Sequence, residues 1–255
     1  MSDLHPSSPR QGDEPVAQEI SRLISGIRNF LMQEQDLFGN TIYPSAEQGA
    51  HSKEGKERSL GGYPAEPWAN ASSLNDLNSM ICECQKCPLG ATRTKFVFGV
   101  GNPNAELVLI GEAPGADEDA KGEPFVGRAG QLLNKILEAV HFKREDVYIC
   151  NILKCRPPNN RDPLPEEVRE CEPYLWKQLE IIKPKIILCL GRISAQVLLK
   201  TTDSLTSLRA NVHDYRGIPL MVTYHPAALL RNPNWKRPTW EDVQRLRKMY
   251  DELKK

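Results

Sequence analysis

The sequence has no feature that would place it in a membrane or in the secretory pathway. Its apolar runs are all far shorter than a membrane span, and its first residues, Met1 to Pro6, show no basic stretch followed by an apolar core. Complete disulfide pairing is also excluded, because the chain has 7 cysteines, an odd number. Free cysteines fit a reducing compartment, where they serve as core residues or metal ligands. We therefore expect a soluble, cytoplasmic protein without a membrane partner.

Net charge is absent as well, because 33 Lys and Arg side chains offset 33 Asp and Glu side chains. This balance hides an asymmetry along the chain. Residues 1–79 carry 6 basic and 11 acidic side chains, whereas residues 80–255 carry 27 and 22. The second part is mildly basic, which permits a polyanionic partner.

The beginning of the chain differs in composition from the rest. From Val16 to Asp36, apolar side chains recur at the spacing of one helical face, after acidic and proline start signals at residues 13–15. We predict an amphipathic helical extension over residues 1–38, which could bind a protein partner. Residues 39–78 have few large apolar side chains and are predicted to form a flexible linker.

Residues 79–255 are predicted to form one α/β domain, because short apolar runs alternate with amphipathic stretches. The predicted strands are Leu107–Ile110, Val147–Leu153, Ile186–Leu190 and Leu220–Tyr224, and the predicted helices are Ala129–Val140, Pro165–Ile182, Ile193–Lys200 and one that begins at Thr239. This alternation indicates a mostly parallel sheet with helices on both faces. Ligands of such sheets bind at the carboxyl ends of the strands, where Glu112, Asn151 and His225 are expected.

Four cysteines have the pattern of a metal site closed by tertiary folding. They are Cys84, Cys87, Cys155 and Cys171, the first two of which form a Cys-x-x-Cys pair. Four thiolates can hold tetrahedral Zn²⁺ or a [4Fe–4S] cluster, and the spacing does not choose between them. Cys82 is a nearby extra thiol, whereas Cys150 and Cys189 lie inside apolar strand runs and are predicted to be core residues.

Several short segments near these strand ends could form a ligand pocket, although each signal is weak alone. The turn Gly111-Glu112-Ala113-Pro114-Gly115 could hold backbone N–H groups open toward a ligand. Phe125 could offer its ring to a planar group, and the amide of Asn151 can donate and accept at once. His225 could stabilise a developing anion. The alternatives are a core aromatic, a cap residue and an ordinary loop histidine.

The segment after His225 has an apolar tip followed by a basic residue. Leu229 and Leu230 could wedge into a nucleic-acid duplex, and the Arg231 guanidinium could meet a phosphate. We therefore regard these three residues as candidate DNA contacts.

Five of these motifs, taken together and in order, resemble those of the family 4 uracil-DNA glycosylases, the iron–sulfur branch of that superfamily. The motifs are Cys-x-x-Cys-Pro-Leu at 84–89, Gly-Glu-Ala-Pro-Gly at 111–115, Pro-Phe-Val-Gly-Arg-Ala-Gly-Gln at 124–131, Asn-Ile-Leu-Lys-Cys-Arg-Pro-Pro at 151–158 and His-Pro-Ala-Ala-Leu-Leu-Arg at 225–231. The resemblance covers about residues 80–255.

The resemblance implies a three-layer αβα sandwich and a DNA repair enzyme that hydrolyses the N-glycosidic bond of uracil, leaving an abasic site. Its substrate would be uracil-containing DNA, single-stranded or duplex. It also implies a [4Fe–4S] cluster on Cys84, Cys87, Cys155 and Cys171. The uracil pocket would be lined by Gly111, Glu112, Ala113, Phe125, Asn151 and His225, with Phe125 stacking on the base, Asn151 reading its edge and His225 facing O2.

One position departs from the pattern of related families. Those with a Gly-Gln-Asp-Pro motif have an aspartate where this chain has Ala113, so Glu112 is the candidate replacement and Glu118 and Asp119 are nearby alternatives. The covalent branch of the superfamily carries a histidine-containing insertion before the stacking Phe. Residues 116–123 contain no histidine, which favours turnover over capture.

The chemistry assigns two catalytic candidates. Departure of uracil leaves positive charge on the sugar and negative charge on the base, so His225 fits stabilisation of the anion and Glu112 fits the sugar or the water. The base must be flipped out of the stack to reach them. The competing hypothesis is a non-catalytic iron–sulfur or zinc module that binds DNA within a replication or repair assembly. The missing carboxylate at Ala113 keeps that hypothesis open.

Overall fold

The computed structural model describes residues 66–254, in which six strands form one sheet. The strands are β1 (Val100–Gly101), β2 (Leu107–Gly111), β3 (Tyr148–Asn151), β4 (Ile186–Leu190), β5 (His213–Tyr215) and β6 (Ile218–Thr223). Their order is β1-β3-β2-β4-β6-β5. The four central strands are parallel to one another, and the short edge strands β1 and β5 pair antiparallel with their neighbours.

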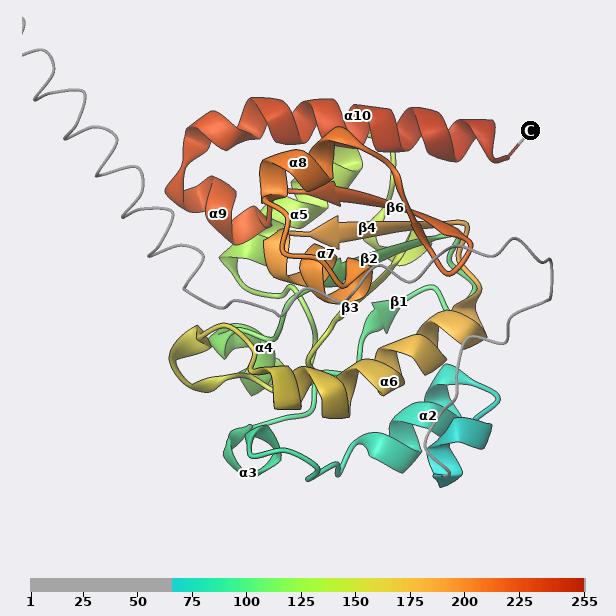
Figure 1. Ribbon diagram of the computed structural model, residues 1–255, viewed down its shortest axis with the longest axis vertical. Coiled ribbons are helices and arrows are strands. Elements are labelled where there is room, and N and C mark those ends of the chain that lie inside the picture. Colours follow the sequence, from blue (N-terminus) through green and yellow to red (C-terminus); the bar gives the residue numbers. More distant parts are fainter. Residues whose placement is uncertain (1–65, 255) are drawn as a thin grey trace, which may run out of the picture. The chain divides into compact units, whose positions relative to one another are not determined.

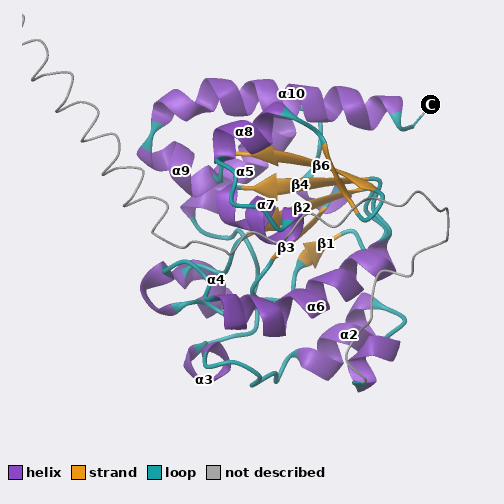
Figure 2. Ribbon diagram, viewed as in Figure 1, coloured by secondary structure: helices purple, strands orange, loops and turns teal. Residues whose placement is uncertain are grey.

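Helices connect and cover the strands (Figures 1 and 2). The α-helices are α2 (Leu74–Ile81), α3 (Leu89–Thr92), α4 (Ala116–Lys121), α5 (Arg128–Ala139), α6 (Pro165–Ile182), α7 (Arg192–Leu199), α8 (Leu205–Ala210), α9 (Pro226–Arg231) and α10 (Lys236–Glu252). Four 3-10 turns accompany them: η1 (Pro67–Asn70), η2 (Arg144–Asp146), η3 (Pro158–Asn160) and η4 (Pro233–Trp235). Within this part of the chain, none of the helices combines the length and the apolar character that a membrane crossing requires.

Alternate side chains of each buried strand enter two separate cores, because successive residues of a strand point to opposite faces. In β2, Val108 and Ile110 pack with residues of α2, α6, α7 and α8. Leu107 and Leu109 pack instead with residues of α5 and α10. The sheet is thus covered by helices on both faces, and the predicted three-layer αβα fold is confirmed.

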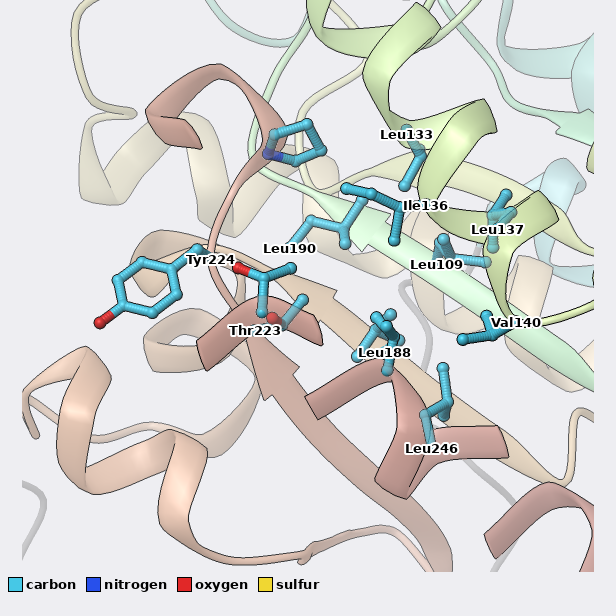
Figure 3. A pocket seen from close by; sticks show the side chains of 13 residues that line it. Leu109, Leu133, Ile136, Leu137, Val140, Leu188, Leu190, Thr223, Tyr224 and Leu246 are labelled. Carbon is cyan, nitrogen blue, oxygen red and sulfur yellow. The ribbon is translucent and has the colours of Figure 1, made fainter. Parts of the chain in front are cut away.

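The second core contains a small apolar cavity of about 10 Å³ (Figure 3). Side chains of α5, β2, β4 and α10 surround it, among them Leu133, Leu109, Leu188 and Leu246. A space of this size with a mostly apolar lining offers water few polar partners. It is a packing gap between α5, α10 and the sheet.

The four long strands and the four predicted helices occur where the sequence predicts them, with boundaries shifted by at most three residues, whereas the edge strands β1 and β5 and the short helices α4 and α9 were not expected. The helix expected to begin at Thr239 begins at Lys236. Its Pro238 lies in the first turn, where a helix tolerates proline because those N–H groups have no intrahelical acceptor.

The expected linker over residues 39–78 ends earlier than predicted. Residues 66–78 contain η1 and most of α2, and Trp68 and Leu77 are 4% and 0% exposed in the first core. These apolar side chains are few, but they pack against the helix α6 side of the sheet, which composition alone does not reveal. The predicted helix over Val16–Asp36 and the extension over residues 1–38 lie outside the described residues.

Candidate active site

The candidate site lies at the carboxyl ends of β2 and β3, where Gly111 is paired in register with Asn151. A Cβ atom placed on Gly111 would lie 2.3 Å from Asn151 Oδ1 and 2.8 Å from Phe125 Cζ. Both distances are far below a normal contact. The sequence therefore needs glycine at this position, because the amide of Asn151 and the ring of Phe125 converge on it.

A tight loop before α5 holds the Phe125 ring in place. Phe125 has φ of +53°, in the left-handed region that non-glycine residues rarely adopt. Its carbonyl oxygen lies against Gly130, where an added Cβ would come within 1.8 Å. Glu118 Oε1 accepts hydrogen bonds from the main-chain N–H groups of Val126 and Gly127, at 2.9 and 3.0 Å. The loop is thus fixed by the close packing of Phe125 against Gly130 and by the hydrogen bonds to Glu118.

His225 follows β6 and caps the N-terminus of α9. Its Nδ1 accepts a hydrogen bond from the Ala227 N–H at 3.1 Å, so the ring proton is on Nε2. Burial, aided by the positive charge of Arg231, lowers the pKa of His225 to about 4. The ring is 5.4 Å from that of Phe125 between centroids, with 33° between the planes. At neutral pH the site therefore holds a neutral imidazole that can donate from Nε2.

Asn151 is 2% exposed, and its Oδ1 has no hydrogen-bond partner among the described residues. A buried acceptor of this kind is costly unless something else satisfies it. The main chain of Asn151 is held by the buried Lys154, whose Nζ donates to the Asn151 carbonyl at 2.8 Å. The same Nζ donates to Gln178 Oε1 at 2.6 Å. The main chain of Asn151 is thus held in place, and its side-chain amide has an unused acceptor beside Gly111.

Glu112 is half-buried at the end of β2, next to these residues. Burial, reinforced by the negative charge of Asp162, raises the pKa of its carboxyl to about 8, against the opposing effect of Arg192. Ala113, which follows, is partly buried and packs on the first core. A carboxyl group with such a pKa near a pocket is a candidate for acid–base or electrostatic work.

The two alternative carboxylates are engaged elsewhere. Glu118 holds the Phe125 loop, and Asp119 is 6% exposed and accepts from the Thr94 N–H at 2.9 Å. Both carboxylates are thus already bonded to main-chain N–H groups. Among the three carboxylates considered from the sequence, Glu112 is the one whose side chain makes no hydrogen bond within residues 66–254, which favours it for the role.

The four candidate ligand thiols pack on the first core. Cys155 and Cys171 are buried, and Cys84 and Cys87 are half-buried. Burial raises the pKa of Cys155 to about 11 and that of Cys171 to about 12. Such thiols are deprotonated when a metal binds them.

Hydrogen-bond donors surround these sulfur atoms. Tyr174 Oη donates to Cys84 Sγ at 3.3 Å, the Lys154 N–H to Cys171 Sγ at 3.3 Å, and Arg93 Nη1 to Cys155 Sγ at 3.5 Å. Donors of this kind tune and stabilise thiolate clusters. Within residues 66–254, no three His, Cys, Asp or Glu side chains are close enough to bind a single metal ion.

The other three cysteines are separate from this set. Cys82 Sγ donates to the Ser79 carbonyl at 3.6 Å. Cys150 and Cys189 are 1% and 0% exposed in β3 and β4, which confirms their prediction as core residues.

The three candidate DNA contacts lie in α9 but differ in exposure. Leu230 is 41% exposed and Arg231 is exposed, whereas Leu229 is 1% exposed. The Leu229 side chain is buried in this structure, because the helical turn directs it into the protein, and its contact with DNA stays a prediction. Leu230 and Arg231 are the two of the three whose side chains are accessible to DNA in this structure.

Two charged residues near the site were missed by the sequence reading. Asp162 lies in the loop after β3, and Arg192 begins α7 directly after β4. Arg192 could have been found by the rule that located Asn151, since it follows a predicted strand by two positions. Asp162 has no such signal, because η3 and a long loop separate it from its strand.

Comparisons with known proteins agree with this architecture. The family model described as "Uracil DNA glycosylase superfamily" matches residues 98–247. A protein of Archaeoglobus fulgidus named type-4 uracil-DNA glycosylase is 47% identical over 182 residues, which are 68% of this chain and 92% of that protein. Proteins of the same name from Saccharolobus solfataricus and Thermotoga maritima are 45% and 43% identical, over 69% and 66% of this chain and 85% and 90% of theirs.

Proposed function

The chain belongs to the uracil-DNA glycosylase superfamily, and we propose that the pocket around Gly111 carries out uracil excision through Asn151, Phe125, His225 and Glu112. The enzyme is a uracil-DNA glycosylase of DNA repair, a hydrolase of the N-glycosidic bond. The observation that carries the residue assignment is the buried Asn151 Oδ1, which has no partner in the described part of the chain.

Asn151 has the donor and acceptor that the uracil edge requires. Uracil presents an N3–H donor beside the O4 acceptor, so Oδ1 would accept from N3–H while Nδ2 donates to O4. Cytosine presents the reverse pattern, an N3 acceptor beside an amino group. It would leave both groups of the buried amide without a suitable partner, which is a strong basis for rejection. The Phe125 ring would stack on the flipped base.

His225 would act as a neutral hydrogen-bond donor. As the glycosidic bond breaks, negative charge develops on uracil, and a donor fixed in place beforehand stabilises it without reorganisation. The Ala227 N–H holds the ring by Nδ1, which leaves Nε2–H for O2 of the base. Because the pKa of His225 is lowered to about 4, the ring does not carry its own positive charge at neutral pH.

Glu112 would act in its ionised form on the other product of bond cleavage. A carboxylate near the sugar stabilises the developing positive charge or accepts a proton from the attacking water. Leu230 and Arg231 would brace the DNA next to the vacated position, Leu230 through its exposed apolar side chain and Arg231 through a phosphate.

The four thiols of Cys84, Cys87, Cys155 and Cys171 would hold a [4Fe–4S] cluster. Four thiolates on one zinc ion lie within about 4 Å of one another, whereas a cluster binds each thiolate to a different iron and so suits a wider set. The hydrogen-bond donors to three of these sulfur atoms suit anionic thiolates, and the similarity to proteins named type-4 uracil-DNA glycosylase favours the cluster. When bound to these four residues, such a cluster would cross-link segments that are remote in sequence.

The non-catalytic alternative is not supported, because the curated relatives are named as glycosylases. The domain division remains our proposal: a glycosylase domain that begins at residue 66, preceded by an extension that could bind a protein partner.

The experiment is excision by the purified protein on single-stranded and duplex oligonucleotides that contain uracil, read out by alkaline cleavage at abasic sites. Parallel oligonucleotides with cytosine at the same position are the control. Excision of uracil without excision of cytosine is the expected result. Equal release of both bases would contradict the role of Asn151.

A further inference from the structure

Three charged side chains come from adjacent loops at the carboxyl edge of the sheet. Strand β2 pairs in parallel with β3 on one side, with Gly111 opposite Asn151, and with β4 on the other, with Ile110 opposite Cys189. Neighbouring parallel strands end at the same edge. Glu112 therefore lies between the loop that carries Asp162 and the turn that carries Arg192.

The main chain fixes this arrangement on both sides of Glu112. On the β3 side, the Leu153 N–H donates to the Glu112 carbonyl at 3.0 Å. On the β4 side, Gly191 has φ of +98°, which only glycine adopts readily, and it turns the chain so that Arg192 begins α7. The Gly191 N–H donates to the carbonyl of Thr223 at 2.8 Å.

Asp162 and Arg192 form an ion pair across the two loops. Arg192 Nη2 is 3.3 Å from Asp162 Oδ2, and the two side chains are only 12% and 27% exposed. Arg192 Nη1 also donates to Gln196 Oε1 at 2.8 Å, which fixes the guanidinium. The loop of Asp162 is anchored in turn by the neighbouring pair of Arg161 with the buried Glu167. The ion pair of Asp162 and Arg192 is therefore held in a fixed position at the carboxyl edge of the sheet.

Both members of the pair act on Glu112, in opposite directions. The Asp162 anion raises the pKa of the Glu112 carboxyl and the Arg192 cation lowers it, on top of the effect of burial. His225, at the same edge, is neutral at neutral pH and adds no charge, and Lys154 lies beside Asn151 with its Nζ bonded to the Asn151 carbonyl. Asp162 and Arg192 are the charged residues whose electrostatic effects shift the pKa of Glu112.

We propose that Asp162 and Arg192 are positioning residues for the glycosylase reaction, a fixed ion pair that sets the fraction of Glu112 carrying negative charge when the substrate binds. Removing the charge of one residue alone would leave the charge of the other to act on Glu112 without its counterpart. The proposal rests on the assignment of Glu112 to the reaction, and it adds a specific function for two residues that need not touch the base.

The signs of the two effects differ, which gives a test that a merely structural role would not pass. If excision needs ionised Glu112, the rate rises as pH increases through the pKa of Glu112, about 8. Asp162→Asn removes a negative charge, so the midpoint should move to lower pH. Arg192→Gln removes a positive charge, so it should move to higher pH. A shift of about one pH unit in each direction is expected from the loss of one nearby charge.

The measurement is the single-turnover excision rate on a single-stranded uracil oligonucleotide between about pH 6 and about pH 10, a window in which His225 does not titrate. The double variant Asp162→Asn with Arg192→Gln should return the midpoint toward that of the wild type. Arg192→Lys keeps the charge and should keep the midpoint. As a control, Glu241→Gln breaks the exposed pair with Arg237 on α10 and should leave the profile unchanged.

The outcomes separate this proposal from the assignment on which it rests. Opposite shifts in the two single variants support it, and unchanged midpoints or shifts in the same direction overturn it. Glu112→Gln is measured alongside: loss of the rising limb assigns the limb to Glu112. An unaltered limb in Glu112→Gln would instead remove Glu112 from the reaction, whatever the pair does. If one variant fails to fold, as judged by its melting temperature, the other single variant and Arg192→Lys still decide the question.

Discussion

His225 and Ala227 are joined by a hydrogen bond of 3.1 Å from the Ala227 N–H to His225 Nδ1. This bond caps α9 and at the same time determines which ring nitrogen carries the proton. The first turn of the helix thus prepares the imidazole as a donor before any substrate arrives. Preorganisation of this kind is the basis of electrostatic stabilisation of an anion.

His225→Ala should reduce the single-turnover excision rate by about a hundredfold or more, because it removes a donor aimed at the departing base. Arg231→Ala should act mainly on DNA affinity and should weaken its dependence on salt, since it removes a phosphate contact. Rates and affinities measured for both variants on the same oligonucleotide test this. Loss of affinity with an unchanged rate in His225→Ala would make the histidine a DNA contact.

Asn151→Asp should weaken uracil excision, because a carboxylate loses the amide donor and repels O4 of the base. The mismatch should cost on the order of 2 kcal/mol or more. The measurement is kcat/KM on the uracil oligonucleotide, with Asn159→Asp as a matched control on an exposed turn. Retention of wild-type kcat/KM would remove Asn151 from the pocket.

The purified protein should be brown, with about four irons and a similar amount of acid-labile sulfide per chain. Cys171→Ala should lose iron and lower the melting temperature, because the cluster links segments remote in sequence. Cys82→Ala is the control and should keep its iron, since Cys82 bonds to Ser79 and lies outside the ligand set. One zinc per chain without sulfide, or equal iron in the two variants, would show that the assignment is wrong.

The sequence predicts the parallel sheet and the positions of Asn151 and His225 at its edge, because both follow from long apolar runs with clear ends. It does not predict the short strands β1 and β5, which span two and three residues and carry no periodic signal. The direction of Leu229 depends on how α9 packs on its neighbours. The ion pair of Asp162 and Arg192 joins two loops whose proximity arises only when β2 lies between β3 and β4.

The final prediction concerns where the glycosylase domain begins. A chain that begins at residue 66 should melt at the temperature of the full-length protein and excise uracil at the same rate, because all five motifs and the first core are intact. A chain that begins at residue 83 should be much less stable. It lacks Trp68, Leu74, Leu77 and Ile81, which are 8% exposed or less, and each fully buried side chain of this kind contributes about 1.5–3 kcal/mol. Trp68 also packs edge-on against Tyr174, whose hydroxyl donates to Cys84 Sγ, so the shorter chain should bind iron less well.

Thermal melting, iron content and excision rate, measured on both truncated chains and on the full-length protein, test the boundary. Equal stability and iron content in the two truncated chains would return residues 66–78 to the linker, and failure of the longer chain to excise uracil would place part of the activity in the first 65 residues.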